Sequence, residues 1–196
     1  LLATRILKDN PGETIIHDPR MTWNTVEMVK DAGGVPVQSK TGHAFMKERL
    51  RKENAVYGGE MSAHHYFRDF TYSDSGMIPW LLVTAQMCET GKTLSQLVRE
   101  RKERYPASGE INSRVPDTDR ILEKTRQAYT AQATLEENVD GLSLEFDDVW
   151  RFNLRPSQTE PVLRLNVEAM GDESLMKGKT EEVLDLIRAE GGKVED

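Results

Sequence analysis

Strand-like and helix-like segments alternate between residues 14 and 57, and this order constrains the fold of the chain most. The strand-like runs are 14–18, 35–38 and 55–57, and the helical segments between them are 24–32 and 43–54. Strand, helix and strand in succession predict parallel pairing, because the helix carries the chain back across the sheet. Parallel sheets bind ligands at the carboxyl ends of their strands, where Arg20, Lys40 and Glu60 fall.

The pattern changes at the run 105–109, which contains a proline and a glycine. Beyond it the sequence indicates a strand, a long helix, three strands in succession and a last helix, at 110–115, 116–133, 141–146, 149–154, 162–169 and 172–189. Strands that follow one another through short turns predict an antiparallel sheet. We therefore predict a three-layer α/β domain with a mostly parallel sheet over residues 1–106. A smaller two-layer α+β domain with an antiparallel sheet is predicted over residues 107–196.

Two helices are predicted before this boundary. Residues 76–89 are apolar on most sides, so we expect them to be buried. They include Cys88, the one cysteine, for which a packed structural thiol is favoured over a nucleophile. A single cysteine excludes an internal disulfide, which is compatible with a cytoplasmic location. Residues 93–104 are strongly charged and predict a solvent-facing helix, whose buried stripe is Leu94, Leu97 and Val98.

Composition narrows the classes of partner. The hydrophobic fraction of 37% and the charged fraction of 30% fit a soluble folded protein, and no apolar run is long enough to span a bilayer. The net charge of −7 argues against nucleic-acid binding, which depends on lysine and arginine neutralising phosphates. A small anionic ligand remains compatible with an acidic chain, because a local cationic cluster is enough to bind it.

The run Arg155-Pro156-Ser157-Gln158-Thr159-Glu160-Pro161 lies between two strand-like segments. It combines an arginine fork with two hydroxyls in a turn that prolines stiffen. Such a set suits a phosphate group, since arginine donates two hydrogen bonds and each hydroxyl can donate one. These are also ordinary loop residues, and the run by itself leaves a plain connecting loop equally open.

A second polar run, Gly58-Gly59-Glu60-Met61-Ser62-Ala63-His64-His65, follows the strand-like segment 55–57. Glu60 and Ser62 offer an acceptor and a hydroxyl to a sugar, and His64 offers a hydrogen bond or a titrating group. His65 is expected to pack or to face solvent. Taken alone, this run favours a polar loop without a ligand.

The two runs, together with Lys40-Thr41-Gly42-His43, resemble three ordered motifs of the phosphohexomutases, and among these the bacterial phosphomannomutases. That family has a sugar-binding loop Gly-Glu-Met-Ser-Gly-His and a phosphate-binding loop Arg-x-Ser-x-Thr-x-Pro. Ala63 departs from the common glycine, and its methyl group bears on the pose of His64. The resemblance implies that the chain corresponds to the third and fourth domains of the family.

The resemblance also implies roles for individual residues. Arg155, Ser157 and Thr159 would hold the phosphate distal to the reacting centre, while Glu60, Ser62 and His64 would contact the sugar. Arg20, Lys40 and His43 would assist near the reacting phosphate, although a plain surface charge is an equal interpretation of Arg20. The reaction implied is the interconversion of mannose 6-phosphate and mannose 1-phosphate through a phosphoserine and a hexose bisphosphate. It would supply nucleotide-sugar synthesis, here GDP-mannose.

Two motifs of the family are absent from this sequence: the serine loop that carries the nucleophile and the acidic run that binds Mg²⁺. The resemblance therefore implies that this is the C-terminal half of a longer polypeptide, whose N-terminal domains supply both loops. Mg²⁺ and a hexose 1,6-bisphosphate activator would belong to that whole enzyme. No metal is predicted in this chain, because adjacent histidines on one loop are a poor metal pair without carboxylates in place, and Asp147-Asp148 lacks the family spacing. We expect the chain alone to have no mutase activity.

Two alternatives stay open. The chain can be a stand-alone phosphosugar-binding module without catalysis, or part of a mutase for glucose or another hexose phosphate. A purely structural fragment is a third, weaker interpretation, against which the complete Arg-Ser-Thr set argues.

Overall fold

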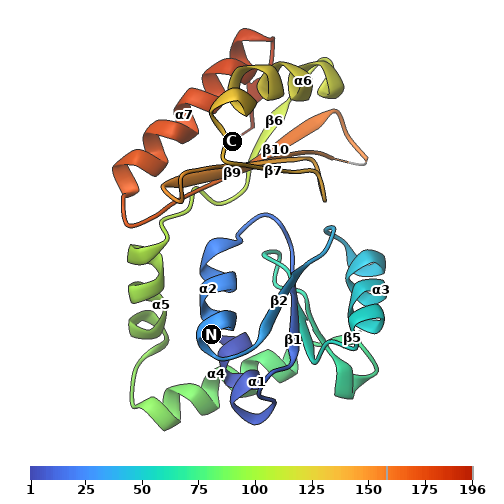
Figure 1. The fold of residues 1–196 in the computed structure, drawn as a ribbon, viewed down its shortest axis with the longest axis vertical. Helices are drawn as coiled ribbons and strands as arrows, with labels where there is room; N and C mark the ends of the chain where they lie inside the picture. The colour runs from blue at the N-terminus through green and yellow to red at the C-terminus, as the bar shows by residue number, and fades with distance from the viewer. Residues whose placement is uncertain (158, 196) are drawn as a thin grey trace. The chain divides into compact units, whose positions relative to one another are not determined.

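The computed structural model describes residues 1–157 and 159–195, and the chain divides into two compact units, Leu1–Arg101 and Lys102–Asp196 (Figure 1). The first unit has a five-stranded sheet in the order β2-β1-β3-β4-β5. Its strands are β1 (Thr14–His17), β2 (Val35–Gln38), β3 (Tyr57–Gly59), β4 (His65–Phe67) and β5 (Ser73–Asp74). Its helices are α1 (Leu2–Asp9), α2 (Trp23–Asp31), α3 (His43–Glu53) and α4 (Met77–Thr90), and α5 (Leu94–Arg104) leads into the second unit.

The parallel part of this sheet confirms the prediction from the alternating segments. β1 pairs in parallel with β2 on one side and with β3 on the other. The antiparallel strands β4 and β5 extend the sheet, and neither they nor α1 were predicted. Both strands are at most three residues long, too short for a period-2 pattern to distinguish them from a loop.

Helices cover both faces of this sheet, which gives the predicted three layers. Because successive strand residues point to opposite faces, Ile15 packs in the cluster that includes Leu7 of α1 and Val29 of α2. Its neighbour Ile16 packs with Met46 and Leu50 of α3. In Figure 1, α3 accordingly lies on the other side of the sheet from α1 and α2.

The predicted burial of α4 is wrong. In α4 only Pro79 is buried among its described residues, while Met77 and Trp80 are 65% and 59% exposed. Cys88 is exposed too, contrary to the predicted packed thiol. The prediction that α5 faces solvent is confirmed, but Leu94 of its predicted buried stripe is exposed, and Leu97 and Val98 are half-buried. The apolar composition of α4 predicted burial, but Ile78 and Leu82 are the α4 residues that pack against the described core of the first unit. Among the described residues no helix combines the length and apolarity that crossing a membrane requires.

The second unit is a six-stranded sheet in the order β11-β6-β10-β9-β8-β7, in which all the described pairings are antiparallel. Its strands are β6 (Ile111–Arg114), β7 (Leu135–Glu137), β8 (Leu142–Phe146), β9 (Trp150–Pro156), β10 (Val162–Ala169) and β11 (Lys193–Val194). Its helices α6 (Thr118–Tyr129) and α7 (Glu173–Ala189) lie on one face of the sheet (Figure 1). The predicted α+β architecture is thereby confirmed.

Alternation along β9 separates the core from a polar face. Trp150, Phe152 and Leu154 point into the core beneath the helices. Arg151, Asn153 and Arg155 occupy the positions between them and therefore lie on the opposite face of the sheet.

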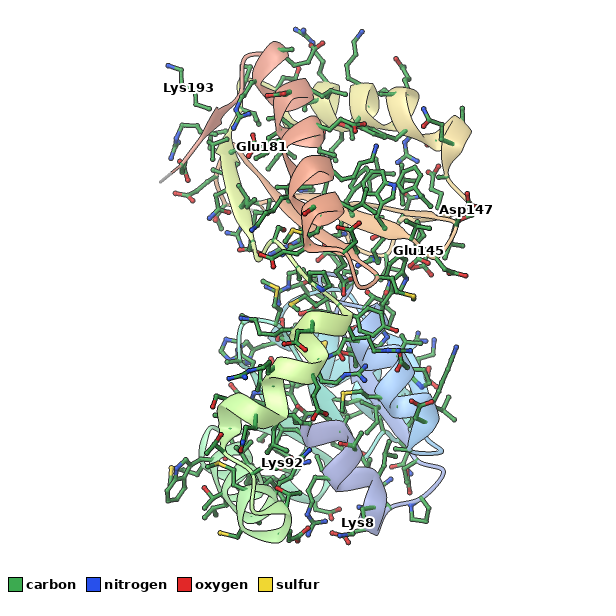
Figure 2. The ribbon with its side chains drawn as sticks, turned by 90° about the vertical axis from the view of Figure 1, so that its left-hand side faces the viewer. Lys8, Lys92, Glu145, Asp147, Glu181 and Lys193 are labelled. Atoms are coloured by element: carbon green, nitrogen blue, oxygen red, sulfur yellow. The ribbon has the colours of Figure 1, made fainter. Side chains whose placement is uncertain are left out.

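Asp147 and Asp148 form the turn between β8 and β9, where Figure 2 labels Asp147. Their φ angles are 50° and 55°. Two successive residues with positive φ are the hallmark of a type I′ hairpin turn, which aspartate and asparagine tolerate well. This acidic pair therefore has a structural explanation as a tight turn.

Candidate functional site

Three loops at the carboxyl ends of β1, β2 and β3 are tied together by Arg20 and Glu60. The Arg20 guanidinium donates to Asp18 Oδ2 at 2.6 Å through Nη2 and lies 3.6 Å from Glu60 Oε2. Glu60 Oε2 also accepts the backbone N–H of Gly42 at 3.0 Å. Parallel strands end at the same edge of a sheet, and this places the three loops side by side, as predicted.

Arg20 is 3% exposed, so the alternative of a plain surface charge is wrong. A buried arginine needs counter-ions, and Asp18 and Glu60 supply them. Asp18 also anchors the loop that follows β3, because its Oδ2 accepts the Met61 N–H at 2.8 Å. The cation is thus held in a fixed position at the mouth of the β1 and β3 loops.

Glu60 is buried as well, and its carboxylate already serves three partners. Besides Gly42 and Arg20, the Tyr66 hydroxyl donates to Oε1 at 2.6 Å. Burial and the adjacent Glu60 carboxylate raise the pKa of Tyr66, so the hydroxyl stays a donor. In this structure Glu60 therefore organises the loops, a role that its polar sequence context did not indicate.

The loop 60–64 closes the hairpin between β3 and β4. The Glu60 N–H donates to the His64 carbonyl at 2.9 Å, and the Ala63 N–H donates to the Glu60 carbonyl at 3.0 Å. Ala63 has φ 65°, a conformation that glycine adopts without strain. Ser62 is exposed at the tip, where its hydroxyl accepts from Arg20 at 3.3 Å.

The two histidines of this loop have different partners. His64 Nδ1 lies 2.8 Å from Asp74 Oδ2, and its ring packs against that of His43 with centroids 4.3 Å apart. His65 instead contacts the Tyr57 hydroxyl through Nδ1 at 2.7 Å, and burial lowers the pKa of its imidazole. His64 therefore points toward His43 and Asp74, whereas His65 packs against Tyr57.

Asp74 is a site residue that the sequence analysis missed. Burial raises the pKa of its carboxyl, but the His65 N–H and His64 outweigh that effect, and the net pKa is lowered. The carboxylate is therefore the acceptor and His64 Nδ1 the donor, which in the neutral imidazole leaves Nε2 as an acceptor. The strand that carries Asp74 is two residues long, and no local pattern relates it to His64.

His43 and Lys40 flank this group. His43 begins α3 and is exposed, and its ring is nearly perpendicular to the Tyr66 ring, with 5.4 Å between the centroids. Lys40 is half-buried, and its Nζ lies 4.9 Å from the centre of the Phe45 ring. The structure thus brings together Arg20, Lys40, His43, Glu60, Ser62 and His64 on neighbouring loops.

In the second unit, Arg155 lies within β9 and not in the loop that follows it, which corrects the prediction. It is 7% exposed, and its Nη2 donates to Glu110 Oε2 at 2.8 Å. Its buried Nε has no hydrogen-bond partner among the described residues. A buried guanidinium with donors to spare is suited to an incoming anion.

Arg164 and Glu110 join Arg155 in a triad that sequence reasoning missed. Arg164 of β10 stands directly opposite Arg155 in the antiparallel register, and its Nη1 lies 3.7 Å from Glu110 Oε1. Like charges at facing positions repel, and Glu110 lies between them as a shared counter-ion. The sequence could have predicted that the two arginines face each other, because β9 and β10 form a hairpin with a short loop. Glu110 could not be predicted in this way, because it comes from a distant segment.

The remaining predicted residues follow in the β9–β10 loop. The Ser157 N–H donates to the Val162 carbonyl at 2.8 Å, and the Ser157 hydroxyl lies 3.4 Å from that of the exposed Thr159. Gln158 lies outside the described residues. Two hydroxyl side chains, Ser157 and Thr159, therefore follow Arg155 within four residues along the chain.

One group of three or more metal-ligating side chains occurs in the described part of the chain: His43, His64 and Asp74. Mg²⁺ takes oxygen ligands in octahedral geometry. Two imidazoles and one carboxylate do not fit that ion, so no step of a magnesium-dependent reaction is assigned to these residues.

Two family models match the chain: phosphoglucomutase/phosphomannomutase α/β/α domain III over residues 1–105 and the C-terminal domain of the same family over residues 110–186. The phosphomannomutase of Escherichia coli K12 is 58% identical over 187 residues, and that of Vibrio cholerae is 53% identical over 189. A phosphoglucomutase/phosphomannomutase family protein of Burkholderia thailandensis has a similar structure, with a TM-score of 0.75 and 28% identity.

These matches cover most of this chain but less than half of each relative. The alignments span 95% and 96% of this chain and 41% of the E. coli and V. cholerae proteins. The structural match covers 98% of this chain and 41% of the Burkholderia protein. The two matched models, in this order along the chain and over nearly its whole length, show that the chain belongs to the phosphoglucomutase/phosphomannomutase family.

Proposed function

We propose that this chain supplies the sugar and distal-phosphate contacts of a phosphomannomutase that interconverts mannose 6-phosphate and mannose 1-phosphate. Residues 1–106 would contribute the sugar side and residues 107–196 the phosphate side. In the whole enzyme, N-terminal domains would add the phosphoserine and Mg²⁺, which supplies charge neutralisation at the transferred phosphoryl group. A hexose 1,6-bisphosphate would serve as activator.

Arg155 carries the proposal. Its guanidinium is buried, and among the described residues it is paired with the Glu110 carboxylate while its Nε has no hydrogen-bond partner. A phosphate would accept from this guanidinium in the fork geometry that arginine favours. Ser157 and Thr159, on the adjoining turn, would donate hydroxyl hydrogen bonds to the remaining oxygens.

On the sugar side, His64 and Ser62 present the accessible polar atoms. Asp74 holds His64 in the tautomer that leaves Nε2 as an acceptor, so His64 can accept a hydrogen bond from a sugar hydroxyl and receive its proton. Arg20, with Asp18 and Glu60 around it, provides a fixed positive charge near that hydroxyl. Lys40 and His43 would complete this side.

Two experiments separate this proposal from its alternatives. Titration of the ¹⁵N-labelled chain with mannose 6-phosphate should shift the amides of loops 60–64 and 155–161. A chimera in which this chain follows the unmatched N-terminal part of the E. coli relative should convert mannose 1-phosphate, while the chain alone should not. Binding without turnover in a folded chimera would favour the non-catalytic module, and faster turnover of glucose 1-phosphate would favour a glucose mutase.

Glu110→Gln should strengthen binding of inorganic phosphate to the chain by about two- to fivefold at low salt. The Glu110 carboxylate and the phosphate compete for the Arg155 guanidinium. A partly exposed ion pair is worth about 0.2–1 kcal/mol, and its removal frees that energy for phosphate binding. Calorimetric titration measures the effect. Glu195→Gln is the matched control, because Glu195 pairs with the exposed Arg114. Weaker phosphate binding by Glu110→Gln would show that the carboxylate positions Arg155 and does not compete with the ligand.

A further inference from the structure

Three side chains with metal-binding atoms converge at the loops of the first unit. His43 comes from the start of α3, His64 from the β3–β4 loop and Asp74 from β5. One ligand atom of each lies within 4.8 Å of the others. The adjacent pair His64 and His65, which argued against a metal site in the sequence, is not the pair that the fold assembles.

The donor set selects a class of ion. Two imidazoles and one carboxylate suit Zn²⁺ and neighbouring transition metals, which bind nitrogen and oxygen at about 2.0–2.2 Å. His64 Nδ1 and Asp74 Oδ2 are 2.8 Å apart with one proton between them, so an ion that takes the place of that proton needs only a small separation of the two atoms. His43 closes from the other side, where its ring already contacts the His64 ring.

The surroundings of these ligands resemble those of a metal site. The His65 N–H donates to Asp74 Oδ1 at 2.9 Å and so holds the carboxylate by its second oxygen. The His43 ring packs nearly perpendicular to the Tyr66 ring, which restricts its orientation. Such outer contacts orient ligands before the ion arrives. The side chains of His64 and Asp74 are 42% and 27% exposed, which leaves a path for the ion and room for water as a further ligand.

We propose that His43, His64 and Asp74 bind one divalent transition-metal ion, such as Zn²⁺, and that the ion takes Nδ1 of His64. The imidazole proton then resides on Nε2, so His64 can no longer accept a hydrogen bond from the sugar hydroxyl. The metal site stands on its own geometry. The inhibition rests on the proposed function, because it requires His64 to be a substrate contact. Bound Zn²⁺ would then weaken the sugar contacts and leave the phosphate contacts of Arg155 unchanged.

Titration of the chain with Co²⁺ and Zn²⁺ tests the site. One equivalent of Co²⁺ should develop visible d–d absorption that Zn²⁺ removes. On binding of diamagnetic Zn²⁺, the imidazole resonances of His43 and His64 should shift, while those of His65 should not. His43→Gln and Asp74→Asn should each weaken Zn²⁺ binding at least tenfold. His65→Gln and Cys88→Ser are matched controls, because they remove the neighbouring histidine and the exposed thiol, and both should bind Zn²⁺ as the parent chain does.

Zn²⁺ binding that survives both His43→Gln and Asp74→Asn, or that is lost in Cys88→Ser, would overturn the site. Amide spectra of each variant establish that its fold is retained, and His43→Ala gives a second, smaller side chain at the same exposed position. Inhibition is tested separately by titrating mannose 6-phosphate into the Zn²⁺-loaded chain. Unchanged shifts in loop 60–64 would overturn the inhibition and leave the metal site standing. If mannose 6-phosphate binds neither form, the proposed function fails instead.

Discussion

Replacing Arg155 with lysine is expected to weaken mannose 6-phosphate binding about tenfold or more. Lysine keeps the charge but loses the fork, and one charge-assisted hydrogen bond is worth about 1.5–3 kcal/mol. Arg155→Ala should weaken binding further, because both the charge and the fork are lost. The titration of loop 155–161 described above measures both variants, and kcat/KM of the chimera should fall in the same order.

The position of Arg155 inside β9 also changes the expected effect on folding. A loop arginine would leave stability unaltered, but Arg155 is buried and paired with Glu110. Arg155→Ala should therefore lower the free energy of unfolding by about 1–3 kcal/mol, because a partly buried carboxylate loses its nearer cation. Arg155→Lys should lower the free energy of unfolding by less than Arg155→Ala does, because lysine keeps the positive charge. The control is Arg114→Lys, an exposed arginine on the same sheet. Unchanged phosphosugar binding in both Arg155 variants would contradict the distal-phosphate role.

Gly141→Ala is expected to destabilise the second unit by about 3 kcal/mol or more, and to disturb Arg155 with it. Gly141 has φ 74°, and a Cβ there would lie 2.4 Å from the Leu154 carbonyl oxygen and 2.6 Å from Arg155 Cα. Both are backbone atoms of the central strand β9, so neither can turn aside as a side chain would. The strain and the clash add, and the strand must shift to relieve them.

Gly178→Ala provides the matched control for this prediction. Gly178 lies inside α7, where an added Cβ meets nothing within 4 Å. Alanine should therefore raise stability by up to about 1 kcal/mol through helix propensity. Unfolding in urea can be followed through Trp150 after Trp23 and Trp80 are changed to phenylalanine, since these are the three tryptophans. Equal stability of the two variants would mean that β9 yields to the new methyl group.

Local patterns in the sequence were sufficient for most of the fold. Strand and helix segments from 14 to 57 set the parallel order of β1, β2 and β3, and this order placed Arg20 and Glu60 at one edge of the sheet. The short strands β4 and β5 carried no readable period, because a two- or three-residue strand forms only beside a longer partner. The exposure of Trp80 and Cys88 likewise depends on which face of α4 meets the unit.

The candidate site shows the same division more sharply. The ordered motifs around His43, Glu60 and Arg155 were enough to indicate the family, because they are contiguous runs of specific residues. The partners of these residues are not contiguous with them. Asp74 reaches His64 only because β5 pairs beside β4, and Glu110 reaches Arg155 only because the chain passes β9 from a distant segment. Sequence alone thus determined which side chains carry the chemistry. The tertiary structure decided which carboxylates set their charge and orientation, since ion pairs depend on distance in space and not along the chain.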